Sequence, residues 1–261
     1  MKIIVTDGAG NILARAEGEG EALLCLDRTY EAGDTIQIIA EQAPAWLCFQ
    51  PDAAVAESAV YAPAGQLHWP VPAGEHRLAY CPGAFAAHRH VVTVRAMAEE
   101  EIRQRRNIAL NPADLRGGTD FYPHVSANVE TRGESCFAAR NVIDGMRLNT
   151  FHGEWPFQSW GIGARADAWC LLEFGRPVRV ERMALTLRAD FPHDAYWTEG
   201  HVVTDGGEEI AFALQKTGSR QWIPLGGRVV RSLRLERMVK SDDPSAFPSL
   251  TEWEVIGSDL L

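Results

Sequence analysis

The sequence predicts an all-β protein built from two β-sandwich domains. Residues 1–98 consist of short apolar segments, such as TIQIIA and HVVTVRA, that alternate with turns rich in Gly, Pro, Asp and Asn. This spacing is typical of antiparallel strands in a sandwich or barrel. No long segment shows the apolar period of a helix, and 261 residues leave room for two cores of ordinary size.

Strands are expected at short intervals through residues 1–98. In order they are KIIVTD, NILARA, ALLCLDRTY, TIQIIA, AWLCF, SAVYA, LHWPVP, HRLAYC and HVVTVRA. The stretch 97–106, MAEEEIRQRR, differs because its acidic residues come first and its arginines last, as a helix dipole favours. We therefore expect an N-terminal sandwich at 1–98, a helical connector at 99–106 and a second domain at 107–261.

The second half of the chain, residues 107–261, again alternates between strands and turns. WCLLEFG indicates a turn at Gly175, VRVERMALTLRAD places its apolar residues on one face, and HVVTDGGEEIAFAL indicates a hairpin about Asp205. One helical turn is expected, in CFAARNVIDG at 136–145. The second half is thus predicted to be another sandwich.

Charge and composition exclude several classes of partner. Lys and Arg number 25 against 35 Asp and Glu, so the net charge of -10 would repel a nucleic acid. Most of this charge, -7, lies in residues 1–100, which hold 6 basic and 13 acidic residues. Lysine occurs only three times, so no polybasic patch favours a membrane surface. We expect no nucleic-acid and no membrane partner.

The apolar start of the chain is interrupted at Asp7, too early for a signal peptide, and no apolar run reaches the roughly 18 residues of a membrane span. These observations predict a cytoplasmic protein. The five cysteines are widely spaced with no CxxC pair, which indicates neither a disulfide framework nor a zinc site.

Two loops of the second half combine aromatic with charged side chains, at 149–161 (NTFHGEWPFQSWG) and 188–197 (RADFPHDAYW). An aromatic ring can stack on the C–H face of a pyranose while charged groups pair with its hydroxyls. The alternative is that the tryptophans plug the ends of the sandwich and the aspartates cap turns. The candidate ligand-binding residues, including one from a third polar segment at 121–134, are His124, His152, Glu154, Trp155, Trp160, Arg188, Asp190, His193, Asp194 and Trp197.

No spacing in the chain is typical of a catalytic site. HExxH and GxSxG are absent, and no Cys lies near a His in sequence. A glycosidase would need two carboxyl groups, such as Glu154 with Asp190 or Asp194, held about 5–10 Å apart. Spacing along the chain does not supply that distance.

Five short motifs follow one another between residues 107 and 257. They are NIAL (107–110), ARNVIDG (139–145), the Trp155–Trp160 loop, WCLLEFG (169–175) and EWEVIG (252–257). By their order and spacing they resemble the discoidin, or coagulation factor type C, family and its carbohydrate-binding relatives. The resemblance implies a galactose-binding-like jelly roll of eight strands, with loops at one end that bind a sugar.

The resemblance also implies a structural calcium ion beside the Asp-Gly turn at 144–145. Carried over residue by residue, its ligands are Asp144, Asn149, Thr150 and Glu252. Carboxylate and carbonyl oxygens suit such a hard cation, which would tie the turn to the last strand. The alternative is that Asp144 only forms a turn and that Glu252 is a surface strand residue.

We therefore expect a non-catalytic carbohydrate-binding protein whose sugar is bound at one end of the C-terminal jelly roll. This chain departs from the extracellular sugar-binding members of the family, because it shows no signal peptide and its loops are more charged. Two alternatives stay open. One is an intracellular enzyme that acts on a sugar or polyol with carboxylate and His groups of the same loops. The other is a protein–protein interaction module, including a homo-oligomer, that uses exposed aromatic residues.

Overall fold

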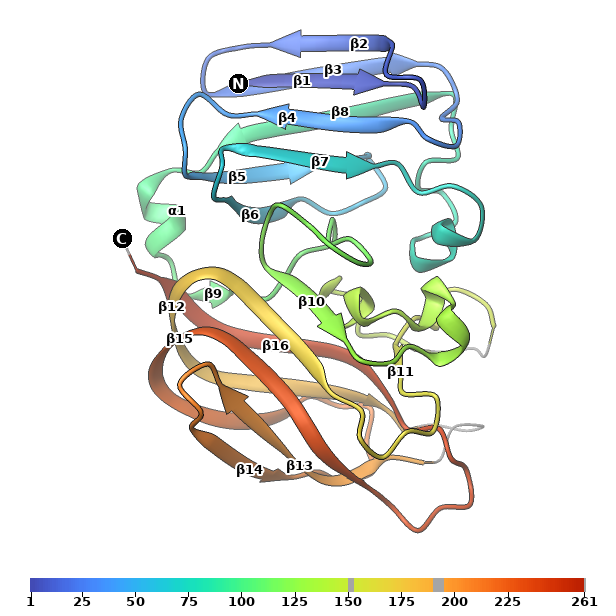
Figure 1. The fold of residues 1–261 in the computed structure, drawn as a ribbon, viewed down its shortest axis with the longest axis vertical. Coiled ribbons are helices and arrows are strands. Elements are labelled where there is room, and N and C mark those ends of the chain that lie inside the picture. The colour runs from blue at the N-terminus through green and yellow to red at the C-terminus, as the bar shows by residue number, and fades with distance from the viewer. Residues whose placement is uncertain (150–152, 190–194, 261) are drawn as a thin grey trace.

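The computed structural model describes residues 1–149, 153–189 and 195–260. Nearly all of its regular structure is β-strand, arranged as antiparallel sheets (Figure 1), which confirms the predicted all-β fold class. No helix in the described part of the chain is long and apolar enough to cross a membrane.

The first half, residues 1–98, forms two four-stranded sheets around one core. The first sheet has the order β2-β1-β4-β7, with β1 at Lys2–Thr6, β2 at Ile12–Glu17, β4 at Thr35–Ile39 and β7 at Gln66–Pro70. The second has the order β3-β8-β5-β6, with β3 at Glu21–Asp27, β5 at Ala45–Gln50, β6 at Ser58–Ala62 and β8 at Arg89–Ala96. Alternate residues of these strands point inward, and the core includes Ile3, Ile36, Leu47, Phe49 and Trp69.

One predicted strand of the first half is wrong. The segment HRLAYC lies mainly in a 3-10 helix, η1 (Gly74–Ala79), and Leu78 is exposed. The backbone of η1 bonds to the second half instead of a sheet, since Gln158 Nε2 donates to the Leu78 carbonyl at 2.6 Å. These contacts come from residues far along the chain, so local alternation could not reveal them.

The connector is helical as predicted but shorter. The helix α1 spans Glu99–Arg103. The Glu101 carboxylate accepts the Ala98 N–H at 2.8 Å and pairs with Arg95, which fixes the first turn against β8. The helical turn expected at 136–145 is also present, as 3-10 helices.

The second half has one large sheet in the order β11-β16-β12-β15-β13-β14, to which β9 and β10 add at β16 and β12. Two strands are long and strongly curved (Figure 1): β12 with 19 residues and β15 with 20. The bounds are β9 Arg106–Asn107, β10 His124–Ala127, η2 Thr131–Gly133, η3 Ser135–Phe137, η4 Ala139–Ile143, β11 Trp160–Gly161, β12 Cys170–Arg188, β13 Trp197–Thr204, β14 Glu209–Ala213, β15 Gln221–Lys240 and β16 Ser249–Asp259. The predicted hairpin about Asp205 is confirmed by the pairing of β13 with β14.

The turn predicted at Gly175 is wrong, because β12 continues through this residue. Gly175 has φ +68°, and the pairing of β12 with β15 shifts register between Glu173 and Val178. A glycine therefore bends the strand here without ending it.

The two halves share buried contacts. Phe121 and Ala113, which follow the connector in sequence, belong to the core of the first half. Trp69 Nε1 donates to the Ala113 carbonyl at 2.8 Å, and Tyr61 pairs with Tyr122 across the junction. The domain boundary at residues 99–106 stays a prediction, and the chain on either side of it is packed together.

Candidate functional site

Trp160 and Trp197 are core residues. Both side chains are fully buried, and their ring centroids lie 6.2 Å apart in the core of the second half. Trp160 Nε1 donates to the Val129 carbonyl at 2.9 Å. Neither ring presents a face to solvent, so the prediction that they stack on a sugar is wrong, and the alternative that they plug the sandwich holds for both.

His124 is also a structural residue and not a ligand-binding one. It is buried on β10, where its Nδ1 lies 2.7 Å from Asp114 Oδ1, while Asp114 Oδ2 accepts the Val125 N–H at 3.0 Å. Burial opposes the charged imidazole, but the hydrogen bond to Asp114 and its charge outweigh that effect, and the pKa of His124 is raised.

Several predicted residues cannot be placed. His152, Asp190, His193, Asp194 and the calcium candidate Thr150 lie outside the described residues. Glu154 is exposed. The carboxylate pair of the enzyme alternative, Glu154 with Asp190 or Asp194, therefore stays a prediction.

Trp155 is the predicted aromatic residue that the structure presents to solvent. It is 36% exposed and lines a pocket of about 400 Å³ between the loop 153–158 and η1. We call this space the Trp155 pocket. Its other lining residues are Gly74, Arg77, Leu78, Tyr80, Pro82, Gly153, Phe157 and Gln158. Its wall is thus an exposed indole, a leucine and two further aromatic rings, with polar groups at the edge.

Contacts behind the Trp155 pocket hold its loop in place. The Phe157 carbonyl accepts hydrogen bonds from Asn149 Nδ2 and Arg188 Nη1, each at 3.3 Å. The Phe157 ring packs edge-on against Phe137, with centroids 6.2 Å apart. Arg188 is itself buried, so we correct its expected role from direct ligand contact to support of this loop.

The polar groups of the Trp155 pocket differ in what they can offer a ligand. Both polar atoms of the Gln158 side chain already have partners: Nε2 donates to the Leu78 carbonyl, and Oε1 accepts the Phe157 N–H. Arg77 Nη2 donates to the carbonyls of Pro82 and Ala84, whereas its Nη1 donates to no residue that the structure describes. Arg77 Nη1 can therefore donate to a ligand hydroxyl.

The sequence prediction missed η1 because its residues were assigned to a strand. Pro72 and Gly74, which precede Arg77 and Leu78, are turn residues that could have indicated a loop here. That this loop meets the loop 153–158 is not visible in sequence.

The predicted calcium ligands Asp144 and Glu252 lie together. Both Glu252 oxygens accept the Gly145 N–H at 3.2 Å, and Asp144 Oδ1 accepts the Met146 N–H at 2.8 Å. Glu252 is fully buried, so the alternative of a surface strand residue is wrong. Burial raises the pKa of Asp144 to about 6, and burial together with the Asp144 charge raises the pKa of Glu252. Arg140 Nη1 is 4.0 Å from Asp144 Oδ2.

This arrangement fits a hard cation. Two buried carboxyl groups that repel each other gain from a divalent ion between them. Asn149 Oδ1, a third predicted ligand, is buried and accepts no hydrogen bond from the described residues. Groups of three or more His, Cys, Asp or Glu suited to a metal do not occur within the described ranges, so amide and carbonyl oxygens would have to complete the site.

Comparison with known proteins gives matches among solved structures alone. No protein-family model and no curated protein matches the chain. A fucose-binding module of Streptococcus pneumoniae is 14% identical, with 58% of this chain and 95% of that one covered and a TM-score of 0.41. The family 32 module of NanJ from C. perfringens, solved with galactose, is 17% identical over 51% and 91%, with a TM-score of 0.37. Chitosan-binding module 1 from a Paenibacillus chitosanase/glucanase is 20% identical over 57% and 98%, with a TM-score of 0.37. Carbohydrate-binding modules are the class of protein that the ordered motifs resemble.

Proposed function

We propose that this protein is a non-catalytic carbohydrate-binding protein whose sugar packs on Trp155. The observation that carries the proposal is the placement of this ring. It lies exposed in a pocket instead of in the core, where Trp160 and Trp197 lie. A flat aromatic face at a concave site suits the C–H face of a pyranose, because the contact removes apolar surface from water.

The Trp155 pocket has the size and chemistry for one sugar unit. Its volume of about 400 Å³ lies within the range of small-molecule sites. Leu78 extends the apolar surface beside the indole, and Arg77 Nη1 provides a donor for a ring hydroxyl. The pocket is formed by both halves of the chain, so the first half supplies part of the binding surface.

The loop of Trp155 is held before any ligand binds. Its carbonyl at Phe157 receives two hydrogen bonds, and Gln158 joins it to η1. A site whose backbone is already fixed loses little conformational entropy on binding. Arg188 and Asn149 thus act as positioning residues for Trp155.

A calcium ion bound by Asp144, Glu252 and Asn149 is part of the proposal. Such an ion would neutralise the repulsion between the two buried carboxylates and stabilise the turn at 144–145 against β16. Its role would be structural. It would hold Asn149, whose side chain also donates to the Phe157 carbonyl behind the Trp155 pocket.

The test is a glycan array followed by calorimetry on the sugars that bind, with Trp155→Ala compared to Trp222→Ala. Trp222 is also exposed, at 43%, but lies on β15 with Arg182 over its ring. We expect Trp155→Ala to weaken binding about tenfold or more and Trp222→Ala to leave it unchanged. If Trp155→Ala and the unaltered protein bind the sugar with equal affinity, the proposal is wrong.

A further inference from the structure

A larger cavity lies beside the Trp155 pocket, and the predicted sugar site does not include it. It has a volume of about 560 Å³ and opens where β7 and η1 of the first half meet the segments 115–118 and 135–140 of the second. We call it the junction cavity. Its volume is that of a site for a small organic molecule.

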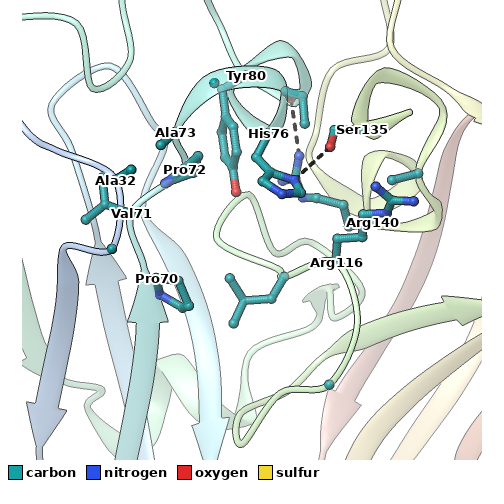
Figure 2. A pocket seen from close by; sticks show the side chains of 16 residues that line it. Ala32, Pro70, Val71, Pro72, Ala73, His76, Tyr80, Arg116, Ser135 and Arg140 are labelled. Carbon is teal, nitrogen blue, oxygen red and sulfur yellow. Dashed lines mark hydrogen bonds between the residues drawn. The ribbon is translucent and has the colours of Figure 1, made fainter. Parts of the chain in front are cut away.

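The junction cavity has one apolar side. Figure 2 shows Pro70, Val71, Pro72 and Ala73 together on this side, with His76, Ser135, Arg116 and Arg140 opposite them and Tyr80 between. The apolar residues offer a surface without hydrogen-bonding side chains, on which a hydrophobic body of a ligand can pack.

The hydroxyl of Tyr80 is an unused polar group in the junction cavity. Figure 2 shows it pointing into the space between the two sides. It makes no hydrogen bond with any residue that the structure describes. Burial raises the pKa of Tyr80, so the phenol stays protonated and can donate.

The opposite side of the cavity offers donors. Arg140 is buried with its guanidinium 4.5 Å from the Tyr80 ring centroid. It donates to the carbonyls of Ala79, Pro112 and Asp114 and to Asn141 Oδ1, which leaves one N–H of Nη2 uncommitted. Arg116 uses its Nε for Glu130, at 2.7 Å, and its two Nη groups bond to none of the described residues.

The nearest carboxylates do not line the cavity and have partners within the chain. Glu130 accepts from Arg116 and from the Ala139 N–H at 2.8 Å. Glu75 accepts the hydroxyl of Ser135 at 2.7 Å and its backbone N–H, and His76 Nδ1 lies 3.1 Å from the same hydroxyl. Asp144 faces Arg140 at 4.0 Å. No carboxylate is among the described lining residues, so the polar side has donors in excess of acceptors.

We propose that the junction cavity binds a small organic carboxylate with an apolar body. The carboxylate accepts hydrogen bonds from Arg116 and the Tyr80 hydroxyl, and the body packs on Pro70, Val71 and Pro72. A planar guanidinium binds a carboxylate through two parallel N–H groups, which a neutral ligand of the same shape does not reproduce. This site goes beyond the proposed sugar site and does not depend on it.

Calorimetry with cyclohexanecarboxylate and with its neutral isostere cyclohexanecarboxamide tests the proposal. We expect saturable binding of the carboxylate and binding of the amide that is weaker by about tenfold or more. Arg116→Gln should reduce the difference in affinity between the two probes. Tyr80→Phe, which removes only the hydroxyl, should weaken binding of the carboxylate. Lack of saturable carboxylate binding, or equal binding of both probes, would overturn the proposal.

A matched variant separates local from general charge effects. Arg165 is also an exposed arginine paired with a carboxylate, Asp167, and lies outside the junction cavity. Arg165→Gln should bind the carboxylate as the unaltered protein does, and an equal loss in both arginine variants would overturn the assignment. Trp155→Ala should retain carboxylate binding while it loses the sugar, so failure of one proposal is distinguishable from failure of the other.

Discussion

Three acid groups and one buried histidine show how polar side chains enter this core. His124 is paired with Asp114, whose second oxygen is used by a backbone N–H. Asp144 and Glu252, in contrast, have backbone N–H partners but repel each other. A buried charge requires a partner, so the first pair is complete within the chain, while the second would gain from the cation that we propose.

The His124 pair predicts a pH dependence of stability. Because the folded-state pKa of His124 is raised above 6.5, the folded protein binds more protons than the unfolded chain in the range just above that pH. This contribution is complete below pH 6.5 and is lost as pH rises through the folded-state pKa. We expect the free energy of unfolding to fall with rising pH in this range, and His124→Gln to remove that part of the slope.

Urea unfolding at a series of pH values between about 6 and 9 measures this slope. His68→Gln is the control, because His68 pairs with Asp120 at the surface, where an ion pair contributes little. A slope that is the same in His124→Gln and in the unaltered protein would contradict the prediction.

Calcium should stabilise the folded protein through Asp144 and Glu252. An ion that binds the folded state alone raises the melting temperature as its concentration increases. We expect thermal unfolding to occur at a lower temperature in chelator than in added calcium, and the difference to vanish in Glu252→Gln. Identical melting of the unaltered protein in chelator and in calcium would remove the ion from the proposed function.

At the scale of elements, glycines and loops decide where strands bend. At Gly175 an added Cβ would lie 2.2 Å from the Tyr122 ring, so the strand passes close to the junction with the first half. Alternation of apolar residues predicts most strands here, but a glycine in such a pattern marks a turn and a bend equally well. The distinction depends on Tyr122, which is more than fifty positions away in sequence.

Substitution of Gly175 should be more costly than that of a glycine in an open turn. Gly175→Ala introduces both an unfavourable positive φ and a clash with Tyr122, whereas at Gly207, with φ +80°, nothing lies within 4 Å of the added Cβ. We expect Gly207→Ala to cost about 1 kcal/mol and Gly175→Ala clearly more. Urea unfolding of both variants checks this, and equal losses would show that the clash is relieved by movement of Tyr122.

At the scale of the whole molecule, the two halves are joined by buried groups. Phe121 completes the core of the first half, and Arg140 from η4 donates to the Ala79 carbonyl at the end of η1. Tyr61 from β6 lies under the Arg176 guanidinium at 5.1 Å. Each of these groups loses its partners if one half unfolds alone.

The buried junction predicts that both halves unfold together. We expect a single transition in differential scanning calorimetry, with the calorimetric enthalpy equal to the van't Hoff enthalpy. Since the contacts of Phe121 couple the halves, Phe121→Ala should lower the stability of the whole chain by about 3–5 kcal/mol. Two separated transitions in the unaltered protein would instead show that each half is an independent folding unit.

The sequence by itself determined the all-β class, nearly every strand of the first half and the presence of a helix within the connector at 99–106, and the family resemblance implied that Asp144 and Glu252 lie near one turn. These follow from local alternation, from turn residues and from the order of short motifs. It did not separate Trp155 from Trp160 and Trp197, because all three lie in similar polar loops of the sequence.

Only the tertiary structure decided which aromatic ring reaches solvent and what surrounds it. Burial depends on neighbours that are distant in sequence: η1 of the first half closes the Trp155 pocket, and Tyr80 with Arg116 and Arg140 forms the junction cavity. A local sequence pattern does not indicate such contacts, because they form only when the two halves of the chain pack against each other. The candidate sites therefore lie at the junction of the two halves and not at the end of one sandwich.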